Sequence, residues 1–196
     1  MILKILKTII VMFWFNLISA CSYKYEEYSN SEVNTYKVIS INAGSLKINK
    51  LNKKPIEEKD EILIIINRTL DEGFEEWVFN KFKIKNSNNE TNINLHSIGG
   101  RLEEVIVEEG VKSFFFGEDK KFKMYLIFDI EFLKDNQFRK KLSIKSEIEF
   151  NLRDNLTIDS RKKIIYLTTK KLLFTIDEKV NSELKKDNFK ELVDFI

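Results

Sequence analysis

The stretch FKMYLIFDIEF, residues 122–132, has an apolar side chain at every even-numbered position. Alternate residues of a β-strand point to opposite faces, so this pattern predicts a strand with one buried face and one face in water. At about 3.3 Å per residue the stretch would extend roughly 36 Å. A strand of that length can cross a β-sandwich or a barrel from end to end.

Segments on both sides of this stretch carry further strand signals. Residues 144–152 repeat the alternation of apolar and polar side chains, and residues 62–66, ILIII, are apolar throughout and predict a central strand covered on both faces. The other predicted strands are residues 36–41, 46–48, 77–84, 92–96, 105–107, 111–116 and 164–176, the last bent near residues 168–171. Turns are expected at residues 42–44, 71–73, 86–89, 99–100 and 117–119.

The order of these elements decides the expected fold class. Successive strands without long helical stretches between them favour antiparallel sheets over an alternating α/β fold. We therefore expect a mainly β fold, an antiparallel β-sandwich or flattened barrel of about nine to eleven strands. From Glu178 onward the apolar spacing becomes helical, which predicts a helical C-terminal tail over residues 177–196, broken near Asp187.

Composition narrows the class of protein. The chain has 196 residues with a single Cys and a single His, which suits one domain and excludes a disulfide-rich or zinc-finger protein. The 33 basic residues nearly balance the 31 acidic residues. A nucleic-acid binder concentrates basic charge, so no nucleic-acid partner is expected. The excess of Lys, Asn and Ile is what an AT-rich genome imposes, and the many Lys pairs are interpreted as solvated surface.

The N-terminus has the three-part layout of a secretory signal peptide. A basic head with Lys4 and Lys7 precedes an apolar run from Thr8 to Ile18, and the small pair Ser19-Ala20 follows. A helix that spans a bilayer needs about twenty apolar residues, and this run has about eleven. A removable leader is therefore favoured over a permanent transmembrane helix.

Residues 17–21, LISAC, resemble the lipobox of bacterial lipoproteins, with Ile18, Ser19 and Ala20 before Cys21. The resemblance implies that the Cys21 thiol carries diacylglycerol and that Ile18, Ser19 and Ala20 are read by the signal peptidase that removes residues 1–20. A generic signal peptide with an accidental Cys, or a buried apolar helix, is the alternative. Residues 21–35 are interpreted as a polar tether after the lipidated Cys, and residues 36–196 as a single β-rich domain.

Few residues suggest catalysis or metal binding. His96 is the only imidazole, so a Ser-His-Asp triad could use no other His, and a zinc site would have to use carboxylates alone. The acidic pairs Glu75-Glu76, Glu103-Glu104 and Glu108-Glu109 are adjacent residues that a strand would point to opposite faces. We expect no metal, no cofactor and no catalytic residue. The weakly favoured alternatives are a calcium loop at residues 86–90 and an exposed ring at Phe114-Phe115-Phe116.

The expected function is that of a lipid-anchored protein of the bacterial cell envelope that acts as a binding or interaction module. Its expected partners are the membrane, through covalent lipid, and an unidentified protein or other surface ligand, at the outer membrane or cell surface. The lipobox, tether and composition resemble those of spirochaete surface lipoproteins. The alternatives are a periplasmic assembly or lipid-transfer component with an apolar groove, and a carboxylate-dependent hydrolase with a cleft near His96.

Overall fold

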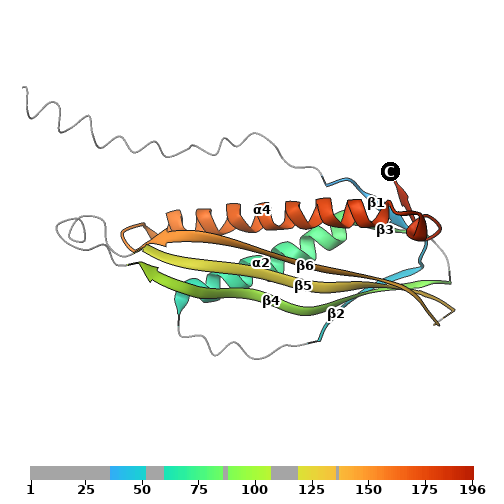
Figure 1. The fold of residues 1–196 in the computed structure, drawn as a ribbon, viewed down its shortest axis with the longest axis horizontal. Helices are drawn as coiled ribbons and strands as arrows, with labels where there is room; N and C mark the ends of the chain where they lie inside the picture. The colour runs from blue at the N-terminus through green and yellow to red at the C-terminus, as the bar shows by residue number, and fades with distance from the viewer. Residues whose placement is uncertain (1–35, 52–59, 86–87, 107–118, 136) are drawn as a thin grey trace, which may run out of the picture. The chain divides into compact units, whose positions relative to one another are not determined.

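The computed structural model describes residues 36–51, 60–85, 88–106, 119–135 and 137–196 (Figure 1). The contacts within the chain divide it into two units, Met1–Thr35 and Tyr36–Ile196. The structure described below is that of the second unit. The lipobox residues Ile18, Ser19, Ala20 and Cys21 lie outside the described residues, as do the tether and residues 111–116.

A four-stranded sheet forms one layer of this unit, in the order β2-β4-β5-β6. Its strands are β2 (Ser45–Lys50), β4 (Glu90–Ile106), β5 (Asp119–Lys134) and β6 (Gln137–Arg153). β2 is parallel to β4, whereas β4, β5 and β6 form an antiparallel meander. A second, three-stranded sheet has the order β3 (Phe82–Ile84), β1 (Ile39–Ile41), β7 (Val193–Phe195), with β3 parallel and β7 antiparallel to β1.

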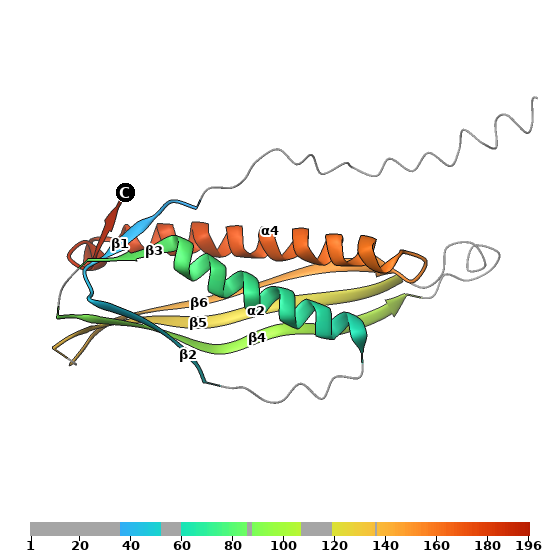
Figure 2. The ribbon, with the colours of Figure 1, turned by 180° about the vertical axis from the view of Figure 1, so that it is seen from behind.

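Two long helices cover one face of the four-stranded sheet. Helix α2 (Glu61–Lys81) packs on β4, helix α4 (Ile158–Leu184) packs on β6, and the helices contact each other (Figure 2). Each helix begins at a side-chain cap: Asp60 accepts a hydrogen bond from the Ile62 N–H at 2.8 Å, and Thr157 accepts one from the Ser160 N–H at 3.3 Å. The capped ends fix where the two helices start.

The core lies between the helices and the sheet. All six even-numbered apolar residues of 122–132 are buried there, which confirms the alternation that predicted this strand. An aromatic cluster joins the layers: the Phe128 ring of β5 lies 5.2 Å from the Phe74 ring and 5.8 Å from the Trp77 ring, both from α2. Offset and edge-on ring pairs of this kind add to the burial energy.

The strands predicted at residues 62–66 and 77–81 are wrong, because both belong to α2. Ile62, Ile65 and Ile66 face the core at helical spacing, while Ile64 is 47% exposed. A short run of β-branched residues is compatible with a buried strand or with one face of a helix, and here contact with the sheet decides for the helix. The turn predicted at residues 71–73 lies inside the same helix.

The bent strand predicted at residues 164–176 is also wrong, because these residues form the middle of α4. The predicted helical tail contains the end of α4, a 3-10 turn η2 (Asp187–Phe189) and strand β7, so only its first part is a regular helix. The turn predicted at residues 99–100 lies within β4. Residues 92–96 and 144–152 are in strands as predicted.

The prediction of a mainly β domain is confirmed in that strands hold more of the described residues than helices do. The predicted number of strands and their uniformly antiparallel arrangement are matched only in part: the described residues form seven strands in two mixed sheets, with no closed barrel. Helices rather than a second large sheet cover the apolar face. No helix within the described ranges is long and apolar enough to cross a membrane.

Candidate functional site: the uncovered face of the four-stranded sheet

The face of the four-stranded sheet opposite α2 and α4 has no described helix or strand over it. Figure 1 looks onto this face, and Figure 2 shows the helices on the other side. The register of β4, β5 and β6 shows which residues share it. The uncovered face is formed by Asn92, Asn94, Arg101, Glu103, Lys121, Lys123, Tyr125, Ile127, Asp129, Glu131, Lys141, Ser143, Lys145, Glu147 and Glu149.

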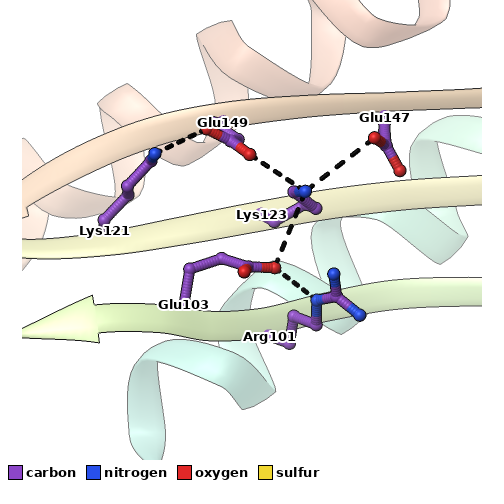
Figure 3. Close-up of polar contacts among 6 residues, drawn as sticks. All are labelled: Arg101, Glu103, Lys121, Lys123, Glu147 and Glu149. Atoms are coloured by element: carbon purple, nitrogen blue, oxygen red, sulfur yellow. Dashed lines mark hydrogen bonds and ion pairs between the residues drawn. The ribbon is translucent and has the colours of Figure 1, made fainter.

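A chain of ion pairs crosses this face from β4 to β6 (Figure 3). The Lys123 ammonium of β5 lies at its centre, 2.9 Å from Glu149 and 3.8 Å from both Glu103 and Glu147. The Lys121 ammonium lies 2.7 Å from a second oxygen of Glu149. Arg101 pairs with Glu103, so three basic and three acidic side chains alternate across the three strands.

Hydrogen bonds within this cluster favour the charged forms of Glu149, Lys121, Lys123 and Arg101. Hydrogen bonds from Lys121 and then Lys123 lower the pKa of Glu149 to about 2. The hydrogen bond with Glu149 in turn raises the pKa of Lys121. A surface whose charges alternate at this spacing presents donors and acceptors in a fixed pattern, which suits recognition of a polar partner surface.

A second cluster surrounds His96, which lies in an irregularity of the β4 register between Leu95 and Ser97. Its imidazole Nε2 contacts the Asp129 carboxylate, and the Lys141 ammonium lies 2.6 Å from the same carboxylate oxygen. Ser143 donates a further hydrogen bond to Asp129. Asp129 is buried, with 4% of its surface exposed, although it lies on the uncovered face.

The order of these groups differs from that of a catalytic triad. In a triad the imidazole stands between the acid and the hydroxyl, so that it can take the hydroxyl proton. Here the Asp129 carboxylate stands between His96 and Ser143. The charged side chain beside this carboxylate is Lys141 rather than a second acid, so the cluster does not match the paired carboxylates of a glycosidase either.

The Asp129 cluster predicts a loss of stability in acid. Burial raises the pKa of Asp129, but hydrogen bonds from Lys141, Ser143 and His96 outweigh it and lower the pKa from 3.8 to about 2. A carboxyl whose pKa is lower in the folded state stabilises the fold above its unfolded pKa, and the benefit is lost as the pH falls through the folded pKa. We expect about 2 kcal/mol of stability to disappear between about pH 5 and pH 1.

Urea denaturation of the protein and of the Asp129→Asn variant at several pH values measures this contribution. The variant should be less stable than the original chain at pH 7. When the free energy of unfolding is plotted against pH, the curves of the two proteins should converge below pH 2. Curves that stay parallel throughout would show that Asp129 is not the titrating group.

Two residues of the calcium loop predicted at residues 86–90, Asn89 and Glu90, bind other side chains or backbone groups in the structure. Asn89 Nδ2 donates to the Asn42 carbonyl at 3.0 Å, and Glu90 pairs with Lys47 at 2.8 Å. Within the described part of the chain, no three His, Cys, Asp or Glu side chains group as metal ligands would. Residues 86 and 87 of the predicted calcium loop and the pair Glu108-Glu109 lie outside the described residues.

The sequence pattern identified His96 but not its partners. Asp129 and Lys141 sit on the polar side of alternating strands, where polar residues are expected anyway. Only the register of β4 against β5, shifted by one residue at His96, shows that these groups meet.

No protein-family model matches this chain, and no curated protein matches it either. Solved structures similar to it include the rare lipoprotein B from Shewanella oneidensis, at 15% identity and a TM-score of 0.35 over 71% of this chain and 98% of that one. The minor lipoprotein from Acinetobacter baumannii is 9% identical, with a TM-score of 0.29 over 71% and 94%. Lipoprotein B from Nitrosomonas europaea is 12% identical, with a TM-score of 0.30 over 74% and 90%. Each score lies below 0.5, so the function proposed below is based on the residues of this chain.

Proposed function

We propose that this chain is a lipid-anchored protein of the bacterial cell envelope that binds a macromolecular partner through the uncovered face of its four-stranded sheet. The lipobox at residues 17–21 supports the anchor. The uncovered face is the observation that carries the binding role: it spans β4, β5 and β6 and presents an ordered pattern of charges. The outer membrane or cell surface is the proposed location, and the spirochaete type is a prediction from composition alone.

The structure favours this role over the two alternatives. A lipid-transfer protein needs an apolar groove, whereas a described hollow of about 530 Å³, beside the β5–β6 turn, is lined largely by charged and amide side chains. The hydrolase alternative requires convergent carboxylates or a triad near His96, and the order of groups around Asp129 is that of an ion-pair cluster. We therefore propose a binding protein rather than an enzyme.

Removal of the lipid attachment site tests the anchor. Cys21→Ala should move the protein from the membrane fraction to the soluble fraction of lysed cells, since several acyl chains together make attachment durable. Metabolic labelling with a radioactive fatty acid should mark the original chain and not the variant. Equal labelling of both would place the lipid elsewhere, and absence of label from both would contradict the anchor.

A photo-crosslinking amino acid tests the binding face. At Lys145, which is exposed on the uncovered face, it should give a discrete adduct on irradiation of intact cells. At Phe174, which is 38% exposed on α4, it should give none. Equal adducts from both positions, or an adduct from Phe174 alone, would contradict the assignment.

Protease added to intact cells should remove the protein if it is displayed at the surface.

A further inference from the structure

The end of the domain that carries the small sheet and the β5–β6 turn exposes large apolar side chains to solvent. Phe138 is 61% exposed, Ile84 is 51% exposed and Phe195 is 39% exposed. Phe138 follows the β5–β6 turn, and Ile84 and Phe195 lie on the outer strands β3 and β7 of the small sheet. Figures 1 and 2 both show these elements at the same end of the unit.

Basic side chains lie beside these apolar residues, together with the acidic Asp135 and with Asp194, which pairs with Lys85. Lys134 and Arg139 are exposed beside Phe138, and Lys140 lies next in sequence. The Lys185 ammonium lies 5.6 Å from the centre of the Phe195 ring. Aromatic and aliphatic side chains among lysines and arginines match a membrane interface, where the apolar groups enter the acyl boundary and the cations meet lipid phosphates.

The chain also enters the domain at this end. Tyr36 is three residues before β1, the central strand of the small sheet. The 15 residues from Cys21 to Thr35 cannot exceed about 50 Å even when fully extended. If the opposite end of the domain met the bilayer, the tether would have to run back along the sheet, because positions 120 and 133 of β5 alone are roughly 40 Å apart.

From these observations we infer that the end formed by β3, β7 and the β5–β6 turn rests on the lipid surface, with Phe138, Lys134 and Arg139 as its main contacts. The inference rests on the proposed anchor at Cys21. It adds an orientation of the domain to the anchor. The end with the small sheet faces the bilayer, and the uncovered face lies roughly perpendicular to the bilayer, where a partner can reach it.

The second set of exposed apolar residues provides a matched control. Val105 is 42% exposed and pairs with Lys120 at the opposite end of β4, far from the β5–β6 turn. Val105 and Phe138 are both strand residues close to the surface, so a Trp at either position should be tolerated. Trp77, which is buried, contributes a constant background.

The test uses the lipidated protein, purified from membranes and reconstituted into vesicles of phosphatidylethanolamine and phosphatidylglycerol with brominated acyl chains. Emission from Phe138→Trp should be lower in these vesicles than in vesicles of the same lipids without bromine, because the ring would lie at the acyl boundary, while emission from Val105→Trp should be the same in both. In Phe138→Trp, adding Lys134→Glu and Arg139→Glu should weaken the quenching, because each basic side chain near an anionic surface accounts for about fivefold in affinity. The control pair Lys162→Glu and Lys163→Glu, on α4, should leave it unchanged.

Flotation of the vesicles separates the two proposals. Protein that floats with the vesicles but shows equal quenching at positions 105 and 138 would overturn the orientation and leave the anchor intact. Quenching that persists in vesicles of phosphatidylethanolamine and phosphatidylcholine would support the apolar contact and assign the basic residues no role. Protein that fails to float would overturn the anchor and the orientation with it.

Discussion

Asp177→Ala should lower the free energy of unfolding by about 3–5 kcal/mol, because it leaves a buried lysine without its counter-charge. Asp177 of α4 accepts hydrogen bonds from Trp77 Nε1 at 3.1 Å and from Asn181 Nδ2 at 2.7 Å, and its carboxylate lies 2.8 Å from the Lys81 ammonium. Lys81 also donates to Asn181 Oδ1 at 2.7 Å, and its side chain is fully buried. The four side chains form a closed network between α2 and α4.

The pH dependence of this loss identifies its cause. Burial lowers the pKa of Lys81 below 10.5, and the pairing with Asp177 only partly offsets that effect. Between the lowered pKa and about 10.5 the unfolded chain binds more protons than the folded one, so this group makes stability rise with pH. Without Asp177 the pKa of Lys81 should fall further. The loss in Asp177→Ala should therefore shrink in alkaline solution, where Lys81 can be buried uncharged.

Denaturant unfolding followed by fluorescence of Trp77 measures both effects. Lys81→Met combined with Asp177→Asn should recover most of the stability, since it removes both charges and keeps an acceptor for Trp77. Asp154→Ala is the matched control, because its ion pair with Lys120, at 3.3 Å, is exposed and should contribute less than about 1 kcal/mol. A loss of similar size in Asp154→Ala and Asp177→Ala would contradict the importance of burial.

Gly100→Val should cost about 3 kcal/mol or more, through overpacking where α2 crosses β4. A Cβ at position 100 would lie 2.4 Å from Cγ2 of Ile66, which is fully buried. The adjacent Asn67 Oδ1 accepts a hydrogen bond from the Gly100 N–H at 2.7 Å, so α2 cannot move away without breaking it. Thermal unfolding of the Ala and Val variants should show a graded loss.

Gly73→Ala is the matched control for this prediction. A Cβ at position 73 of α2 would meet Leu173 Cδ1 at 3.2 Å and Thr169 Cγ2 at 3.3 Å, both of them side-chain atoms of α4. The gain of about 1 kcal/mol in helix propensity should offset this tighter contact. If Gly73→Ala destabilised the protein as much as Gly100→Ala, close approach of the helix to β4 would not explain the need for Gly100.

The sequence by itself determined the long strands β5 and β6, because each needs one apolar and one polar face and the period of two is visible in residues 122–132 and 144–152. Of β4 it determined residues 92–96 and 105–106, while the predicted turn at residues 99–100 divided one continuous strand into two. It also determined the expectation of a lipid anchor, because the lipobox is a contiguous motif that is read before folding. Residues 61–81 and 158–184 form helices, but parts of both were predicted as strands. Their β-branched and aromatic residues are common in strands and are also found in buried helices.

Only the tertiary structure decided the rest, because it depends on contacts between residues far apart in the chain. The run ILIII at residues 62–66 becomes a helix since the sheet beneath it covers one side only, and Gly99-Gly100 stays within a strand since α2 needs the space that a side chain would fill. The meeting of His96 with Asp129 follows from one register shift, and that of Lys81 with Asp177 from the packing of two helices. The residues next to each partner in the sequence do not indicate such pairings, so they could not be predicted from the sequence alone.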